Sequence, residues 1–176
     1  FNYYEVKEKI MAEALSRINS ECDVEGILHI FRSTLIKQVQ SHRNQFHLDF
    51  FWKGIKRVFQ QLKGGYSVVG YLGGKGLFGF RDPHGIRPLI FGKREVKGKA
   101  PEYIFASESV VLDILGFTII GDLAPGEAIF VTDDETRDVH RKIIIQKAFR
   151  PCIFEYVYLA RPDSMLDRVS VHKARM

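Results

Sequence analysis

The periodicity of apolar residues changes once along this chain, at the glycine pair Gly64-Gly65. Before the pair, apolar residues recur at steps of three and four, which is typical of helices that bury one face. After it, short apolar runs alternate with turn residues, which is typical of strands. Helices followed by hairpin-spaced strands predict an α+β fold with antiparallel sheet rather than a repeated βαβ unit.

Helices are expected in three places before the glycine pair. Two follow apolar stripes, made by Val6, Ile10, Ala14, Leu15 and Ile18, and by Ile27, Leu28, Phe31, Leu35, Ile36 and Val39. The third spans 49–63, with Asp49 as N-cap and Gly64 as the stop. Beyond the pair, a short helix capped by Ser107 is expected at 108–115, and strands are expected at 66–72, 77–80, 88–91, 103–106, 117–120, 128–131 and 152–159.

Composition narrows the class of protein. The chain has 176 residues, 45% of them hydrophobic, which is enough for one domain with its own core. No apolar run approaches the roughly 20 residues of a membrane helix, and the sequence contains no basic-then-apolar leader pattern, so export is not expected. Cys22 and Cys152 are too few for a disulfide framework, so a cytoplasmic location is expected. The net charge of +5 is spread among acids, which favours a mixed-charge surface over a nucleic-acid patch.

Common catalytic motifs fit poorly. Residues 74–79 match G-x-G-x-x-G, but a strand and Pro83 follow where a dinucleotide site needs a helix, so a hairpin is predicted there. The six histidines form no pair with zinc-ligand spacing. Cys22 has no neighbouring base, and a small structural cysteine is favoured over a nucleophile.

Two polar segments remain. Asp82 and Pro83 begin a turn between two predicted strands. Arg81 and Arg87 can each donate two parallel hydrogen bonds to a carboxylate or a phosphate. We predict a structural loop whose arginines pair with acids of the same domain, with Asp82 or Glu108 as the nearest candidates. The second segment is Asp23 and its neighbours at a helix start, where the carboxylate either caps free amides or holds the ammonium group of an amino-acid ligand.

Four segments together carry a family resemblance. FRDPHGIRPLIFGKR (80–94), ASES (106–109), LAPGEA (123–128) and CIFEYVYLARPDS (152–164) follow one another in the order and spacing of the amidophosphoribosyltransferases. The last segment is the most specific, because the R-D-x-x-G-x-R-P-L turn is shared in looser form by other class II glutamine amidotransferases. The chain resembles this family across residues 2–176.

The resemblance implies a fold and a reaction. The fold would be an N-terminal-nucleophile hydrolase sandwich of two antiparallel sheets between helical layers, incomplete at the N-terminus. Residues 1–160 would be part of the class II glutamine amidotransferase domain, and 161–176 a linker into a missing phosphoribosyltransferase domain. Family enzymes use glutamine and phosphoribosyl pyrophosphate, with Mg²⁺ in that second domain, to make 5-phosphoribosylamine in de novo purine synthesis, and the full-length protein is expected to be a homo-oligomer.

The resemblance also assigns residues. The family nucleophile is an N-terminal cysteine, which should lie upstream of Phe1, so no catalytic residue is expected in this chain and the fragment itself should be inactive. Asp23 aligns with an aspartate that binds the α-amino group of glutamine. Cys152 aligns with a [4Fe–4S] ligand of some members, although a plain cysteine is favoured. The alternatives are another class II amidotransferase, such as a glucosamine-phosphate synthase or an asparagine synthetase, and a non-catalytic basic binding domain.

Overall fold

The computed structural model describes residues 1–12, 18, 20 and 22–176. The chain divides into two compact units, Phe1–Gly64 and Gly65–Met176, and the boundary falls at the glycine pair where the sequence periodicity changes. Ala14, Leu15 and Asn19, which belong to the expected first helix and the break after it, lie outside the described residues. No helix among the described residues is long and apolar enough to cross a membrane.

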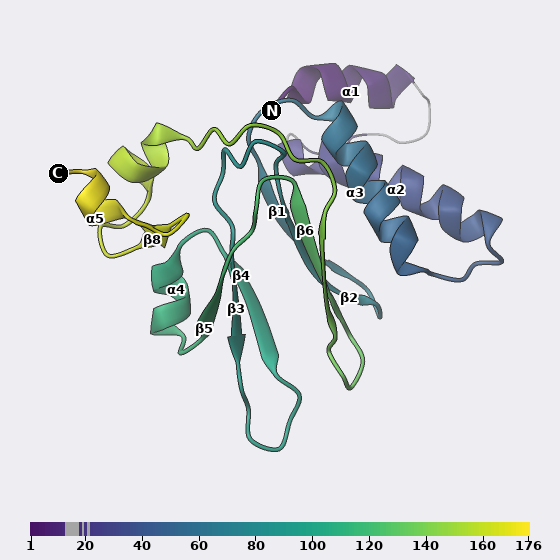
Figure 1. The fold of residues 1–176 in the computed structure, drawn as a ribbon. Coiled ribbons are helices and arrows are strands. Elements are labelled where there is room, and N and C mark those ends of the chain that lie inside the picture. Colours follow the sequence, from purple (N-terminus) through teal and green to yellow (C-terminus); the bar gives the residue numbers. More distant parts are fainter. Residues whose placement is uncertain (13–17, 19, 21) are drawn as a thin grey trace. The chain divides into compact units, whose positions relative to one another are not determined.

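Unit 1 consists of the helices α1 (Tyr3–Ala12), α2 (Asp23–Ser41) and α3 (Leu48–Gln61) (Figure 1). Apolar side chains of α2 and α3 form its core, and the rings of Phe31 and Phe51 meet edge to face at 5.7 Å. Gly54 is required at this crossing, because a Cβ on it would lie 2.8 Å from the Phe31 ring.

The expected helix caps of unit 1 are wrong in detail. Cys22 and His47 stand at the N-cap positions of α2 and α3, and neither side chain makes a capping hydrogen bond. Asp23 and Asp49 lie instead within the first turns. Carboxylates there still interact favourably with the helix dipole, which explains why the sequence signal was correct to within one or two residues.

Unit 2 contains two antiparallel sheets, both visible in Figure 1. The four-stranded sheet has the order β1 (Ser67–Leu72), β2 (Gly76–Arg81), β6 (Glu127–Thr132), β7 (Val139–Ile143). The three-stranded sheet has the order β4 (Glu102–Ala106), β3 (Ile90–Arg94), β5 (Thr118–Asp122). A small hairpin of β8 (Met165–Leu166) and β9 (Val169–Ser170) follows.

The G-x-G-x-x-G run is a hairpin, as predicted. It turns the chain from β1 into β2, with Gly74 at φ 63°. A Cβ on Gly79 would lie 2.7 Å from the ring of Phe105, so this glycine allows the two sheets to approach closely. The turn and the close packing of the sheets therefore explain these two glycines without a bound dinucleotide.

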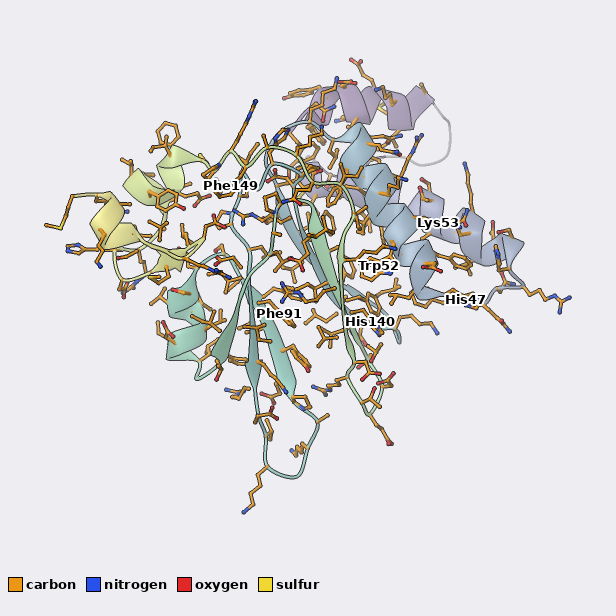
Figure 2. All side chains as sticks on the ribbon, in the orientation of Figure 1. His47, Trp52, Lys53, Phe91, His140 and Phe149 are labelled. Atoms are coloured by element: carbon orange, nitrogen blue, oxygen red, sulfur yellow. The ribbon has the colours of Figure 1, made fainter. Side chains whose placement is uncertain are left out.

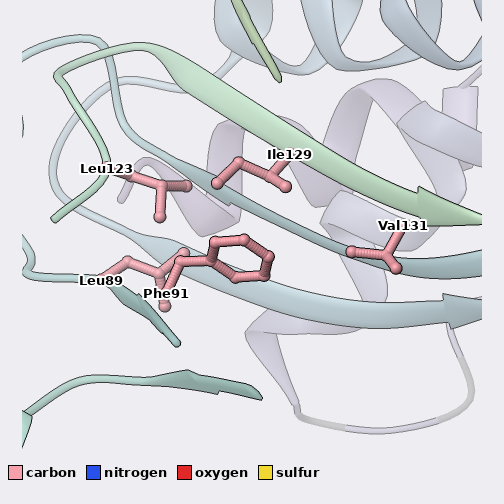
Figure 3. Close-up of a cluster of buried hydrophobic side chains, with 5 residues drawn as sticks. All are labelled: Leu89, Phe91, Leu123, Ile129 and Val131. Carbon is pink, nitrogen blue, oxygen red and sulfur yellow. The ribbon is translucent and has the colours of Figure 1, made fainter. Parts of the chain in front are cut away.

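The main core of unit 2 lies between the sheets and is drawn in Figure 3. Its buried members come from β3, from β6 and from the segments before β3 and after β5: Leu89, Phe91, Leu123, Ile129 and Val131. Phe91 also stacks on Tyr103 of β4, with the ring centroids 5.4 Å apart.

A second core covers the opposite face of the three-stranded sheet. Ile90 of β3 packs there with Leu112 of α4 (Ser109–Ile114), with Leu166 of β8 and with Val171 of α5 (Val171–Ala174). Leu166 and Val171 are almost completely buried, so residues 161–176 contribute to the hydrophobic core of unit 2.

Three sequence expectations fail in unit 2. The expected strand at 152–159 is wrong, because Glu155–Leu159 forms a π-helix, η1, with its apolar side chains largely exposed. Strand β7 was not anticipated, since Val-His-Arg-Lys-Ile is a charged edge strand without an apolar run. Helix α4 starts after Glu108 and has no side-chain cap, so the cap assigned to Ser107 is wrong.

Candidate functional site

The loop that joins β2 to β3 is organised by one buried carboxylate. Asp82 Oδ1 accepts a hydrogen bond from the His84 amide at 2.9 Å. Its Oδ2 accepts from the amides of Ile86 at 2.9 Å and Arg87 at 3.1 Å, and from a fourth, more distant amide at 3.4 Å. Gly85 supplies the left-handed position of the turn at φ 61°. Asp82 therefore holds the loop through backbone amides and not through an arginine.

Arg81 is buried, with 1% of its surface exposed, and it uses its whole guanidinium group inside unit 2. Nη1 and Nη2 donate to the two carboxylate oxygens of Asp167 at 2.6 and 2.9 Å. Nε, Nη1 and Nη2 also donate to the carbonyl oxygens of Arg87, Leu123 and Gly85 at 2.7–2.8 Å. These five bonds match the five N–H donors of arginine. The structure thus corrects the expected partner: it is Asp167, and neither Asp82 nor Glu108.

Arg87 has a different acidic partner. Its Nη1 lies 2.8 Å from Oε1 of the buried Glu155, the first residue of η1. Burial raises the pKa of Glu155, and the nearby Arg87 acts in the opposite direction. Glu108, the other expected partner, accepts instead from the Arg161 amide and the Ser164 hydroxyl, both at 2.8 Å. The two arginines therefore pair with different acids, Arg81 with Asp167 in the β8–β9 turn and Arg87 with Glu155 in η1.

The other residues assigned from sequence lie apart from this loop. Asp23 is an exposed residue of unit 1, at the first position of α2, and its neighbour Glu25 accepts hydrogen bonds from Ser20. Cys152 belongs to unit 2, is half-buried, and donates its amide to the carbonyl of Ile86 at 3.1 Å. Among the described residues, no group of three or more histidine, cysteine or acidic side chains is arranged to hold a metal.

One feature of unit 2 was missed from the sequence, a cavity of about 390 Å³ beside the arginine loop. It lies between the β5–β6 connection, the segment after β7 and the β8–β9 turn, and its lining includes Asp122, Arg141, Phe149, Asp167 and Arg168. These residues come from widely separated parts of the sequence. No local motif joins them, so only the tertiary structure brings them together.

Comparison with known proteins gives a consistent result, although no family model matches the chain. Curated amidophosphoribosyltransferases from Pseudomonas aeruginosa and Escherichia coli are 42% and 41% identical over 99% of this chain. The Saccharomyces cerevisiae amidophosphoribosyltransferase is 40% identical over 96% of it. The chain spans about a third of the length of these relatives, 33–34%.

Solved structures agree in fold. Glutamine phosphoribosylpyrophosphate amidotransferase from Bacillus subtilis, complexed with ADP and GMP, covers 97% of this chain with a TM-score of 0.75 and 26% identity. A structure described as the allosteric regulatory enzyme of purine biosynthesis covers the same share with a TM-score of 0.76. The α+β sandwich with antiparallel sheets is thus the expected N-terminal-nucleophile hydrolase type. The chain is therefore similar to the amidophosphoribosyltransferases along nearly its whole length, and it spans about a third of the length of these curated relatives.

Proposed function

We propose that this chain is part of the glutamine amidotransferase region of an enzyme that makes 5-phosphoribosylamine from glutamine and phosphoribosyl pyrophosphate, at the first committed step of de novo purine synthesis in the cytoplasm. The observation that carries this proposal is the match to amidophosphoribosyltransferases at about 40% identity along nearly the whole chain. The matched residues include CIFEYVYLARPDS at 152–164, the segment most specific to the family.

We further propose that residues 1–160 belong to the glutamine amidotransferase domain and that 161–176 lead towards a phosphoribosyltransferase domain. Mg²⁺ and phosphoribosyl pyrophosphate would act in that second domain. A [4Fe–4S] cluster on Cys152 would need its other three ligands from beyond residue 176, and a plain cysteine is the role that we propose. We also propose that the full-length protein is a homo-oligomer.

Asp23 is the residue of this chain that we propose to contact the substrate. Hydrolysis of glutamine requires that the amino acid be held by its charged ends while its side-chain amide is attacked. The Asp23 carboxylate is exposed in the first turn of α2, so an ammonium group can reach it. A charge-assisted hydrogen bond to the α-amino group would orient the substrate without taking part in bond breaking.

The experiment is a chimera. Residues 1–176 would replace the matching third of the Escherichia coli enzyme, and glutamate release and phosphoribosylamine formation would be measured. We expect glutamine-dependent activity, because a family member supplies compatible packing and contacts. The parent enzyme and residues 1–176 alone provide the upper and lower reference. A chimera that folds and assembles but hydrolyses no glutamine would refute the proposed function.

Asp23→Asn in the active chimera tests the substrate contact. Loss of the charge should raise KM for glutamine about tenfold or more and change kcat less, because the lost interaction is made equally in the bound substrate and the transition state. Asp49→Asn is the matched control, since Asp49 is also an exposed acid in the first turn of a unit 1 helix. An unchanged KM in Asp23→Asn would remove the role given to Asp23 and leave the family activity intact.

A further inference from the structure

The cavity beside the arginine loop has the size and lining of a small-molecule site. Its volume of about 390 Å³ lies within the roughly 300–1,000 Å³ of ligand pockets. The walls combine apolar side chains with charged groups that come from three separate segments of unit 2. Phe149, labelled in Figure 2, provides an aromatic wall, and the guanidinium group of Arg81 lies 5.7 Å from its ring centroid.

The two acidic residues of the cavity lining carry an excess of negative charge. Asp122 and Asp167 both line it, and Asp122 Oδ1 accepts the Asp167 amide at 3.0 Å. The only guanidinium group that bonds to these carboxylates among the described residues is Arg81, and it bonds to both oxygens of Asp167. Two carboxylates facing one guanidinium leave one negative charge without a partner. Burial raises the pKa of Asp122, and the negative charge of Asp167 adds to the rise, while the hydrogen bond from the Asp167 amide and the charge of Arg81 act in the opposite direction.

A second part of the lining carries an excess of positive charge. Arg141 is neutralised by Glu127, with Nε and Oε1 2.8 Å apart. Arg168 is exposed and has no hydrogen bond or ion pair to any residue that the structure describes. Both residues of the β8–β9 turn are left-handed, Asp167 at φ 49° and Arg168 at φ 64°. A non-glycine residue rarely adopts this conformation, and the ion pair of Asp167 with Arg81 holds the turn in place.

We propose that this cavity binds a small zwitterion with an amine and a carboxylate, of the amino-acid class, separately from any catalytic glutamine site. The ammonium group supplies the cation that Asp122 lacks, and the carboxylate pairs with Arg168. The carbon chain packs against Phe149, Pro125 and Ile120, which also line the cavity. A molecule with only one of the two charges leaves either Asp122 or Arg168 without a partner of opposite charge and therefore binds more weakly. This inference does not rest on the proposed function.

The test uses four probes of one carbon skeleton on the 176-residue chain. 5-Aminopentanoate and L-norvaline are isomers that carry both charges at different spacings, whereas pentanoate and pentylamine carry one charge each. Binding is followed by calorimetry and by amide chemical shifts of residues 120–124. At least one zwitterion is expected to bind about tenfold more tightly than either single-charge probe, since one lost charged hydrogen bond has about that effect. Equal affinity for all four probes, or no saturation by either zwitterion, would overturn the proposal.

Two variants assign the ends of the ligand. Asp122→Asn keeps an acceptor for the Asp167 amide and should abolish the preference for the zwitterion over pentanoate. Arg168→Asn keeps a residue that tolerates the left-handed backbone and should abolish the preference over pentylamine. Arg150→Asn, at an exposed arginine outside the cavity lining, is the matched control and should bind like the parent chain. If both site variants keep the parent affinities while their thermal unfolding shows intact folds, the zwitterion site is wrong.

Discussion

At the scale of single residues, the buried Arg81 is the most heavily bonded side chain of the β2–β3 loop. We predict that Arg81→Lys lowers the free energy of unfolding by about 3 kcal/mol or more, because lysine has three donors and cannot reproduce a two-pronged contact with Asp167. Urea unfolding measures the change. Arg87→Lys is the control at a half-exposed single contact, for which about 1 kcal/mol or less is expected. Equal losses in the two variants would contradict the structural role of Arg81.

A second residue-scale prediction concerns pH and Asp122. Burial raises the pKa of this carboxyl above its ordinary value of 3.8, so the folded protein binds more protons than the unfolded chain just above that value. Asp122 therefore does not affect the free energy of unfolding below pH 3.8, where the carboxyl is protonated in both states. As the pH rises through the raised pKa, the unfolded chain releases its proton more readily, so the folded protein loses stability. Asp122→Asn should therefore gain stability relative to the parent chain between about pH 4 and 7, by about 1.4 kcal/mol for each tenfold difference in proton affinity between the folded and unfolded states. Unfolding curves at several pH values decide this, and a constant difference between the two proteins would count against it.

At the scale of elements, the edge strands differ in how well they are protected. Strand β7 carries His140, Arg141 and Lys142, and such charges hinder pairing with another chain. Strand β5 is also an edge, yet its Thr-Ile-Ile run is uncharged, and Ile119 and Ile120 are 40% and 46% exposed. Strand β5 therefore leaves an uncharged and partly exposed sheet edge.

We therefore predict that the 176-residue chain associates with itself in a concentration-dependent way and that Ile119→Lys reduces this association. The added charge should disfavour strand pairing at the β5 edge while the fold is kept, since the Ile119 side chain is 40% exposed. Sedimentation velocity at several concentrations gives the measurement. Ile143→Lys on β7 is the control and should have little effect, because that strand is already charged. A parent chain that stays monomeric at all concentrations would rule out the prediction.

At the scale of the whole molecule, the C-terminal segment matters for the fold of unit 2. It contributes Leu166 and Val171 to the second core and Asp167 to the buried ion pair. Removal of residues 161–176 should therefore lower the stability of unit 2 by several kcal/mol, because it opens a cavity and leaves Arg81 buried without its acid. Removal of Met176 alone, which is 95% exposed, should change little. If the truncated chain unfolds at the same temperature as the parent chain, residues 161–176 do not stabilise unit 2 and serve only as a linker.

The sequence by itself determined the fold class, the change from helices to strands at Gly64-Gly65, the places of most strands, and the resemblance to amidophosphoribosyltransferases, whereas the division into two compact units was seen only in the structure. The properties that the sequence determined depend on local periodicity and on short motifs, which are readable without neighbours. Only the tertiary structure decided that Arg81 pairs with Asp167, that 155–159 is a π-helix, and that Asp122 and Arg168 line one cavity. Arg81 and Asp167 are 86 positions apart, and the partner of a buried charge is chosen by packing across such distances rather than by adjacent residues.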